Sequence, residues 1–189
     1  LWLGAPAGIR SLVEDKGIFP LYSELEDPLL VDPDRLYTSW DFCNYSGVDD
    51  DPDAVAEMKR ISSPDAGFVK QFDTWDEVWA HLGEAPVLSK LGLIKRIRNG
   101  KLKTRMVIDS KQSGVSRSCR KQERTLLPKV LHAVYDYLDL ASQCRHHEAD
   151  TQVEFLVADF SDAFFIIPNK QAERKFFVVI FRNRYYVFL

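Results

Sequence analysis

The sequence VEFLVADFSDAFFIIP, residues 153–168, joins a nearly continuous apolar run to two carboxylates, Asp159 and Asp162. A short apolar run of this kind predicts a β-strand that is buried on both faces. A carboxylate at the end of such a strand costs free energy unless a cation satisfies it. Two interpretations follow. Either Asp159 caps the next turn and Asp162 is solvated, or a rigid strand end holds a metal-binding carboxylate.

The length and composition are those of an ordinary soluble globular protein. The 189 residues are enough for one large domain or two small ones. No apolar run approaches the roughly 20 residues that span a bilayer, and the N-terminus lacks the pattern of a signal peptide. Cys43, Cys119 and Cys144 are widely spaced and indicate reduced thiols. We expect an intracellular protein of the cytoplasm or nucleus, neither secreted nor transmembrane. Because the chain begins without Met and ends within an apolar pattern, we also expect a fragment of something longer.

The net charge of −3 conceals a strong asymmetry along the chain. Residues 1–89 contain 6 Lys/Arg and 18 Asp/Glu, which gives a net charge of −12. Residues 90–125 contain 12 Lys/Arg and 2 Asp/Glu, a net charge of +10, and residues 126–189 contain 7 and 8, a net charge of −1. A basic block between an acidic and a neutral part indicates a polyanionic partner.

Two helices are predicted before the basic block. Residues 1–50 show no sustained period, although we expect a short helix near Asp34–Asp41. An Asp N-cap with Pro52 at the first helical position predicts a helix that runs to Arg60. Residues 72–82 predict a second helix, capped by Asp73 or Thr74. Its apolar stripe, which we expect to lie in the core, consists of Trp75, Val78, Trp79 and Leu82.

Residues 86–109 predict a basic β-hairpin. Two β-rich runs flank Asn99-Gly100, the strongest short signal for a two-residue hairpin turn. The cations that crowd this ribbon are Lys95, Arg98, Lys101, Lys103 and Arg105. In one interpretation, the positive charge on an exposed ribbon merely prevents edge-to-edge pairing with another strand. Because no acidic residue is interleaved with these cations, a flap that binds phosphates is the favoured interpretation.

The remaining chain predicts a basic loop, a helix and further strands. Residues 110–122 are polar and basic, which is typical of a loop on a nucleic-acid path and equally of an ordinary surface loop. Residues 123–129 are expected to start a helix that carries its apolar stripe between Val130 and Leu140. Residues 175–181 and 185–189 predict two strands joined by a tight turn.

Asp159-Phe160-Ser161-Asp162-Ala163-Phe164-Phe165 resembles the first catalytic motif of the reverse transcriptases of retroviruses and retrotransposons. The basic ribbon is similar to the fingers hairpin of that family, where the pattern R-x-φ-φ-D matches Arg105, Val107, Ile108 and Asp109. A leucine–proline step, a helix and an aromatic hairpin complete the order, so the resemblance covers roughly residues 86–189. The template-grip motif and the aromatic-x-Asp-Asp turn of the family do not occur in this sequence.

The resemblance implies an RNA-directed DNA polymerase that uses two-metal phosphoryl transfer. It implies an α+β fold: the incomplete fingers and palm of a right-hand polymerase, with an antiparallel sheet packed on helices and a basic fingers β-hairpin. Residues 1–85 would precede the fingers without an assigned function. Residues 86–128 would form the fingers, and residues 129–189 the N-terminal part of the palm.

The resemblance also implies roles for the residues of the catalytic motif. Asp159 would bridge two Mg²⁺ ions, with Mn²⁺ as the alternative, and the backbone carbonyl of Phe160 would be a further ligand. Asp162 would position the deoxynucleoside triphosphate through its backbone, next to Ala163. Phe164 would exclude the 2′ hydroxyl that separates ribonucleotides from deoxyribonucleotides.

The basic residues receive their roles from the same resemblance. Arg105 would neutralise the triphosphate, and Lys95 and Arg98 compete for the place of the second phosphate ligand. The residues expected to contact an RNA or DNA template and its primer are Lys101, Lys103, Lys111, Arg117, Arg120 and Lys121. No membrane partner is expected.

One strand end supplies too few carboxylates for two Mg²⁺ ions. We therefore expect these 189 residues not to polymerise by themselves. The alternative is a non-catalytic nucleic-acid-binding or interaction module derived from the same fold.

Overall fold

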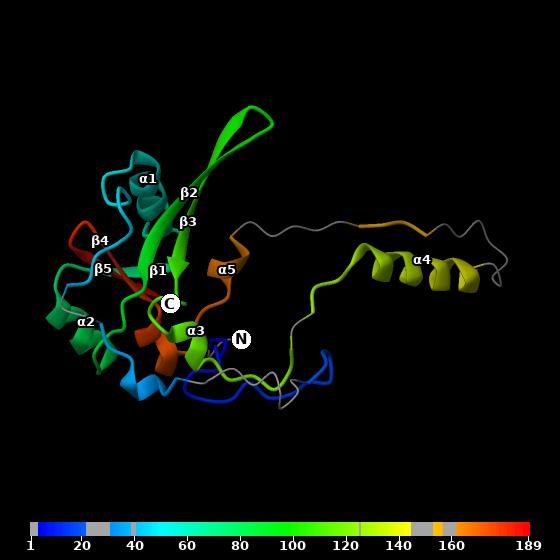
Figure 1. Cartoon of the computed structure of the whole chain (residues 1–189), viewed down its shortest axis with the longest axis horizontal. Helices are drawn as coiled ribbons and strands as arrows, with labels where there is room; N and C mark the ends of the chain where they lie inside the picture. Colours follow the sequence, from blue (N-terminus) through cyan, green and yellow to red (C-terminus); the bar gives the residue numbers. More distant parts are fainter. Residues whose placement is uncertain (1–3, 22–30, 39–40, 125, 145–152, 157–161) are drawn as a thin grey trace.

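The computed structural model describes residues 4–21, 31–38, 41–124, 126–144, 153–156 and 162–189. These residues form a mixed α+β body from which a long β-hairpin and an extended arm project (Figure 1). Both sheets are antiparallel. This agrees with the expected α+β class with antiparallel sheets.

A three-stranded sheet lies at the centre of the body. Its strands are β1 (Val69–Phe72), β5 (Arg184–Phe188) and β4 (Val178–Phe181), in the order β1-β5-β4. The turn between β4 and β5 places Arg182 and Asn183 at φ 49° and 60°, as expected for a tight two-residue hairpin turn. The predicted terminal hairpin is confirmed, but its first strand begins at Val178 and not at Lys175, because Gln171–Phe176 form the 3-10 helix η3. The sheet joins the acidic N-terminal region to the C-terminal end of the chain.

Two helices cover opposite faces of this sheet. Helix α1 (Pro52–Ile61) packs on the face that carries Val179 and Phe188, and α2 (Trp75–Leu82) packs on the face that carries Val178 and Val187. Because side chains alternate along a strand, each face supplies its own core cluster. The helix start at Asp51-Pro52 is confirmed, with the Asp51 side chain accepting from the Asp53 N–H.

The second helix is also confirmed, but it is shorter than expected. It begins at Trp75 after the N-cap Thr74, whose capping box with Glu77 occupies the first turn. Val78 is fully buried, whereas Trp79 is 48% exposed. Trp79 was expected in the core. The helix is only eight residues long and rests on the sheet mainly through one stripe, which leaves the Trp79 side of the helix outside.

The basic hairpin is present as predicted. Strands β2 (Lys90–Arg98) and β3 (Lys101–Asp109) pair antiparallel over their whole length. Asn99 and Gly100 have φ values of 52° and 72°, as a type I′ turn requires. The base of the hairpin joins the core through Leu91, and its tip extends beyond the body (Figure 1).

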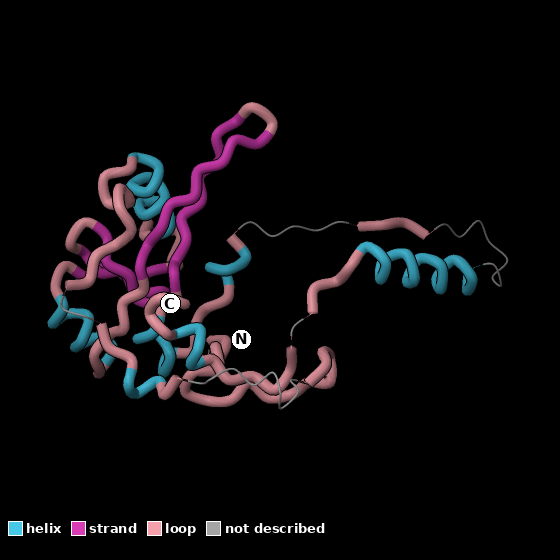
Figure 2. The backbone as a smooth tube through the Cα atoms, viewed as in Figure 1, coloured by secondary structure: helices cyan, strands magenta, loops and turns pink. Residues whose placement is uncertain are grey.

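The arm consists of α4 (Val130–Cys144) and the extended residues 153–156 (Figure 2). The expected helix is confirmed, but none of its residues is buried. The expected doubly buried strand is wrong for residues 153–156, which form no strand and expose 68% of Phe155 and 93% of Leu156. A buried strand needs neighbours on both edges and both faces. Here Phe155 stacks on Tyr137 of α4 at a centroid distance of 5.7 Å.

Short elements complete the described chain. They are η2 (Pro33–Arg35), α3 (Val115–Ser118), α5 (Ala163–Ile166) and η3 (Gln171–Phe176). The short helix expected near Asp34–Asp41 is reduced to η2, because the extended Leu36 ends it. Among the described residues, no helix has the length and apolarity to cross a membrane.

Candidate functional site

The register of the basic hairpin sorts its cations between two faces. Residues directly opposite each other in an antiparallel pair lie on the same face, and successive residues alternate. Arg105 pairs with Ile94, and the next two pairs toward the tip on that face are Arg96–Lys103 and Arg98–Lys101. We call this surface the basic face. Its cations are Arg96, Arg98, Lys101, Lys103 and Arg105.

The basic face is both exposed and unneutralised. All five cations are exposed, and within the described part of the chain none of them forms an ion pair. No acidic residue lies on this face between Arg105 and the tip. Neighbouring like charges on a two-stranded ribbon repel one another, so the arrangement favours an anionic partner.

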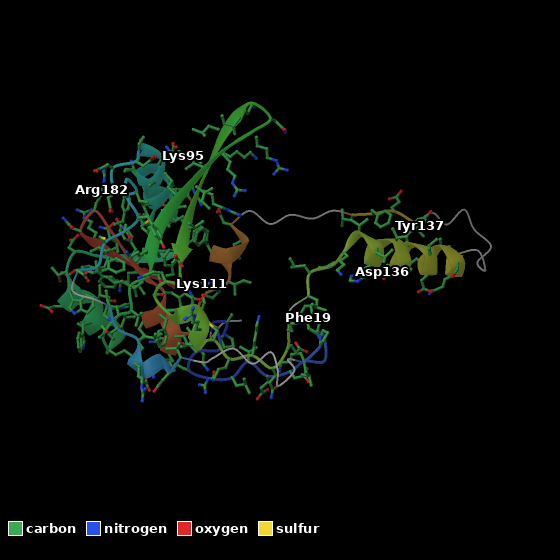
Figure 3. The ribbon with its side chains drawn as sticks, in the orientation of Figure 1. Phe19, Lys95, Lys111, Asp136, Tyr137 and Arg182 are labelled. Atoms are coloured by element: carbon green, nitrogen blue, oxygen red, sulfur yellow. The ribbon has the colours of Figure 1, made fainter. Side chains whose placement is uncertain are left out.

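Lys95 lies on the opposite face of the hairpin. Its ammonium pairs with Asp51 at 2.7 Å and with Asp53 at 3.2 Å, at the start of α1. Thr104, directly across from Lys95, donates to Asp53 at 2.9 Å. The hydrogen bonds to Asp51 and Asp53 raise the pKa of Lys95. Figure 3 shows Lys95 beside α1, where it fastens the hairpin to the helix. Of the two competing residues, the structure therefore places Arg98, and not Lys95, on the face of Arg105.

The cations expected from the sequence for this hairpin did not include Arg96. It lies on the basic face opposite Lys103. The signal was available, because a two-residue Asn99-Gly100 turn fixes the pairs by counting outward from Arg98 and Lys101. Counting in twos from Arg98 leads to Arg96.

The base of β3 is fixed by Asp109, the last residue of the R-x-φ-φ-D pattern. The Tyr45 hydroxyl donates to Asp109 Oδ2 at 2.6 Å, and the backbone N–H groups of Lys111 and Gln112 donate to Oδ1. The hydrogen bond from Tyr45, with those from the backbone, lowers the pKa of Asp109. Asp109 therefore acts as a structural anchor that ends the strand and starts the following loop.

The basic residues of that loop lie in different surroundings. Lys111 and Arg117 are exposed. The Arg120 side chain donates to the Ile9 carbonyl at 3.3 Å, and its backbone N–H donates to the Gly8 carbonyl. Lys121 forms a β-bridge with Val13. The last two residues therefore hold the N-terminal segment against the loop.

The motif that resembles a catalytic strand end is only partly described. Asp159 and Phe160, the expected metal ligands, lie outside the described residues. Asp162 precedes α5 in the left-handed region at φ 57°, and Ala163 and Phe164 open that helix. The two oxygens of Asp162 accept from Nη1 and Nη2 of Arg60, each at 2.8 Å. Because this fork occupies both carboxylate oxygens, Asp162 is held by α1.

Aromatic packing holds the same segment. Phe165, one turn after Asp162, stacks on Phe68 and on Phe188 at centroid distances of 5.5 and 5.9 Å. The chain after the motif is thus fixed to α1 by charge and to the sheet by ring contacts. Neither Arg60 nor Phe68 was expected to support this motif, since both lie in the region without an assigned function.

The described residues do not by themselves make a magnesium site. Among them, no group of three or more His, Cys, Asp or Glu side chains is placed to hold a metal ion. The Asp162 carboxylate is engaged by Arg60. The expected Mg²⁺ ions therefore depend on Asp159 and Phe160, which lie outside the described ranges.

Comparisons with known proteins identify no relative. No protein-family model, no curated protein and no solved structure matches this chain.

Proposed function

We propose that this chain is the fingers and N-terminal palm of an RNA-directed DNA polymerase. The observation that carries the proposal is the basic face, where Arg105 of the R-x-φ-φ-D pattern joins four other cations in one unneutralised strip. Guanidinium forks and ammonium groups are the side chains that match phosphate oxygens. The order of this hairpin, α4 and the Asp159-x-x-Asp162 motif supports the assignment.

On this proposal the basic face holds the phosphates of the incoming deoxynucleoside triphosphate and of the template–primer. Arg105 lies closest to the body and neutralises the triphosphate. Arg96 and Lys103 come next toward the tip, and with Lys101 they contact the nucleic-acid backbone. Arg98, the remaining candidate for the second triphosphate ligand, lies at the tip opposite Lys101. The rigid base at Asp109 keeps the hairpin in register while its exposed tip approaches the partner.

Two Mg²⁺ ions, when bound, would supply activation of the primer hydroxyl and stabilisation of the leaving phosphates. Asp159 and the Phe160 carbonyl are the residues of this chain that would hold them. The protein's own contribution is positioning. Arg60 and the aromatic packing at Phe165 fix the chain directly after the motif, and preorganised groups of this kind lower the cost of assembling a reactive geometry.

Nucleic-acid binding tests the carrying observation. Arg96→Gln and Lys103→Gln should each weaken binding of an RNA–DNA template–primer, because each removes one phosphate contact from the basic face. For B-form DNA, each lost phosphate contact reduces the magnitude of the slope of log binding constant against log salt concentration by about 0.9. We expect each variant to reduce the slope for the RNA–DNA duplex by a similar amount. Lys95→Gln is the matched control from the opposite face and should leave the slope unchanged. Equal effects from all three variants would refute the assignment to one face.

Primer extension tests the polymerase part. In a polypeptide that continues through the later palm motifs, Asp159→Asn should abolish extension while template–primer binding persists. Removal of a single metal-bridging carboxylate disables two-metal transfer, but it leaves the phosphate contacts of the hairpin intact. Extension that survives the substitution would disprove the role of Asp159.

A non-catalytic nucleic-acid-binding module is the second candidate. The basic face favours it, because phosphate binding by five cations requires no metal ion and no carboxylate. The two candidates differ in one measurement. A module would bind the template–primer with the same dependence on Arg96 and Lys103, and it would extend no primer in the longer polypeptide.

A further inference from the structure

A hollow of about 390 Å³ lies where α1 meets the β4–β5 end of the three-stranded sheet. This volume is within the range of small-molecule sites. Helix α1 contributes one stripe of side chains at i, i+3, i+4 and i+7: Val55, Met58, Lys59 and Ser62. The sheet and its turn contribute Gln71, Phe181, Arg182, Arg184 and Tyr186. Figure 3 shows Arg182 on the side of the molecule formed by this turn and α1.

The hollow has an apolar floor and a cationic rim. Met58 and Phe181 are buried, whereas Lys59, Arg182 and Arg184 are exposed. No lining residue is acidic. This is unusual for its place, because residues 1–89, which include the whole of α1, have a net charge of −12. The lining of the hollow is thus cationic, while Asp49 and Asp73 contact Arg182 and Arg184 from outside it.

The cations of the rim keep donors available. Lys59 forms no ion pair within the described ranges. Arg182 donates from Nε to the Asp49 carbonyl oxygen at 2.7 Å, and Arg184 pairs through Nε with Asp73 at 3.2 Å. Both contacts use the inner nitrogen of the guanidinium. In the part of the chain that the structure describes, the terminal nitrogens of both groups carry no hydrogen bond.

Tyr186 gives a second, independent indication of a ligand. The residue is only 6% exposed, yet its hydroxyl has no hydrogen-bond partner among the described residues. A buried phenol normally finds a partner. Among the described residues, no fully buried side-chain polar atom lacks a partner. The Tyr186 hydroxyl is therefore accessible, and Tyr186 lines the hollow. Burial raises the pKa of Tyr186, so the hydroxyl keeps its proton and is available as a donor.

We propose that this hollow binds a small organic phosphate. Its phosphate group would be held by Lys59, Arg182 and Arg184, which offer two guanidinium forks and one ammonium to the phosphate oxygens. Its apolar body would lie on the Val55, Met58 and Phe181 floor, with the Tyr186 hydroxyl as a donor to a polar group. This site is separate in sequence and in elements from the basic face of the hairpin, and it does not depend on polymerase activity.

Titration of the 189-residue chain followed by amide chemical shifts tests this proposal with three probes. Phenyl phosphate carries both the charge and the apolar body, inorganic phosphate carries the charge alone, and benzoate carries a single negative charge on the same ring. Phenyl phosphate should bind about tenfold more tightly than either of the others. The shifts should concentrate on α1 and on the β4–β5 turn.

Variants separate this site from the hairpin. Lys59→Met and Arg184→Gln should each weaken phenyl phosphate about fivefold or more, because each removes a donor from the rim. Both should leave RNA–DNA binding unchanged. Arg98→Gln on the basic face should leave phenyl phosphate binding unchanged. The proposal is overturned if inorganic phosphate or benzoate binds as tightly as phenyl phosphate, or if the rim variants bind it like the unmodified chain.

Discussion

At the scale of single residues, the most informative contact is the fork between Arg60 and Asp162. Arg60 donates to both oxygens of Asp162 and also to Glu57 on its own helix. Hydrogen bonds to Glu57 and Asp162 raise the pKa of Arg60. Asp162 sits at a positive φ that a non-glycine residue adopts at a cost, and the fork offsets part of this cost. A residue more than 100 positions away therefore holds the end of the motif.

A double-mutant cycle of Arg60→Met and Asp162→Asn should reveal this coupling. The pair is partly exposed, with side-chain exposures of 44% and 31%, so screening by solvent limits it to about 1 kcal/mol. The free energy of unfolding of the two single variants and the double variant, measured in urea, gives the coupling. Arg60→Lys should recover only part of it, since an ammonium cannot form the two-pronged contact. A coupling energy of zero would show that the fork does not hold the segment.

At the scale of elements, local signals in the sequence predicted α1, α2, α4 and the two hairpins, because caps, turn residues and periodicity act over a few positions. The assignment of cations to hairpin faces also follows from the turn, once the register is counted. What the sequence did not reveal is the contact between elements. Lys95 matched a phosphate ligand equally well by composition, and only the position of α1 shows that it faces Asp51 and Asp53.

The junction between α1 and the hairpin should make stability depend on pH. The hydrogen bond from Lys95 lowers the pKa of Asp51 in the folded protein. The contribution is therefore present above the unfolded pKa of about 3.9 and is lost as the pH falls through the lower folded value. Thermal unfolding between pH 7 and pH 2 measures this effect. Asp51→Asn keeps a good N-cap but removes the charge, so its curve should fall less steeply in acid. Parallel curves would exclude the junction as the source.

At the scale of the whole molecule, the sequence predicted neither the exposure of the arm nor the strand pairing of the body. The apolar stripe of α4 and the run at residues 153–156 have the patterns of buried elements, and periodicity alone predicts burial for both. The structure leaves them exposed, since burial depends on which surfaces meet and not on the pattern of one segment. The pairing of strands in the body could not be predicted for the same reason. β1 pairs with β5 across more than a hundred residues, and neither strand carries a signal that names its partner.

The longest-range connection of the body is Glu173, a fully buried carboxylate of η3. It accepts from the backbone N–H groups of Ala7, Ile9 and Arg10, and thus ties the N-terminal segment to η3, which leads into β4. Glu173→Ala should leave three N–H groups unsatisfied. Only the hydrogen bond from Ile9 is fully buried, and those from Ala7 and Arg10 are part-buried. At about 1–3 kcal/mol for a buried unsatisfied group, the substitution should destabilise the protein by at least this amount or release the segment.

Limited proteolysis distinguishes these two outcomes for Glu173→Ala. If the segment is released while the body stays folded, cleavage should accelerate between residues 4 and 21 and the unfolding midpoint should change little. Glu173→Gln retains one acceptor oxygen and should give an intermediate result, because one amide oxygen cannot serve three donors in the place of two carboxylate oxygens. Glu123→Ala is the matched control. Its carboxylate accepts from Lys16, Ile18 and Phe19 at the exposed end of the same segment, where water replaces lost hydrogen bonds at little cost. If Glu123→Ala destabilised the protein as much as Glu173→Ala, burial could not be the reason that Glu173 matters.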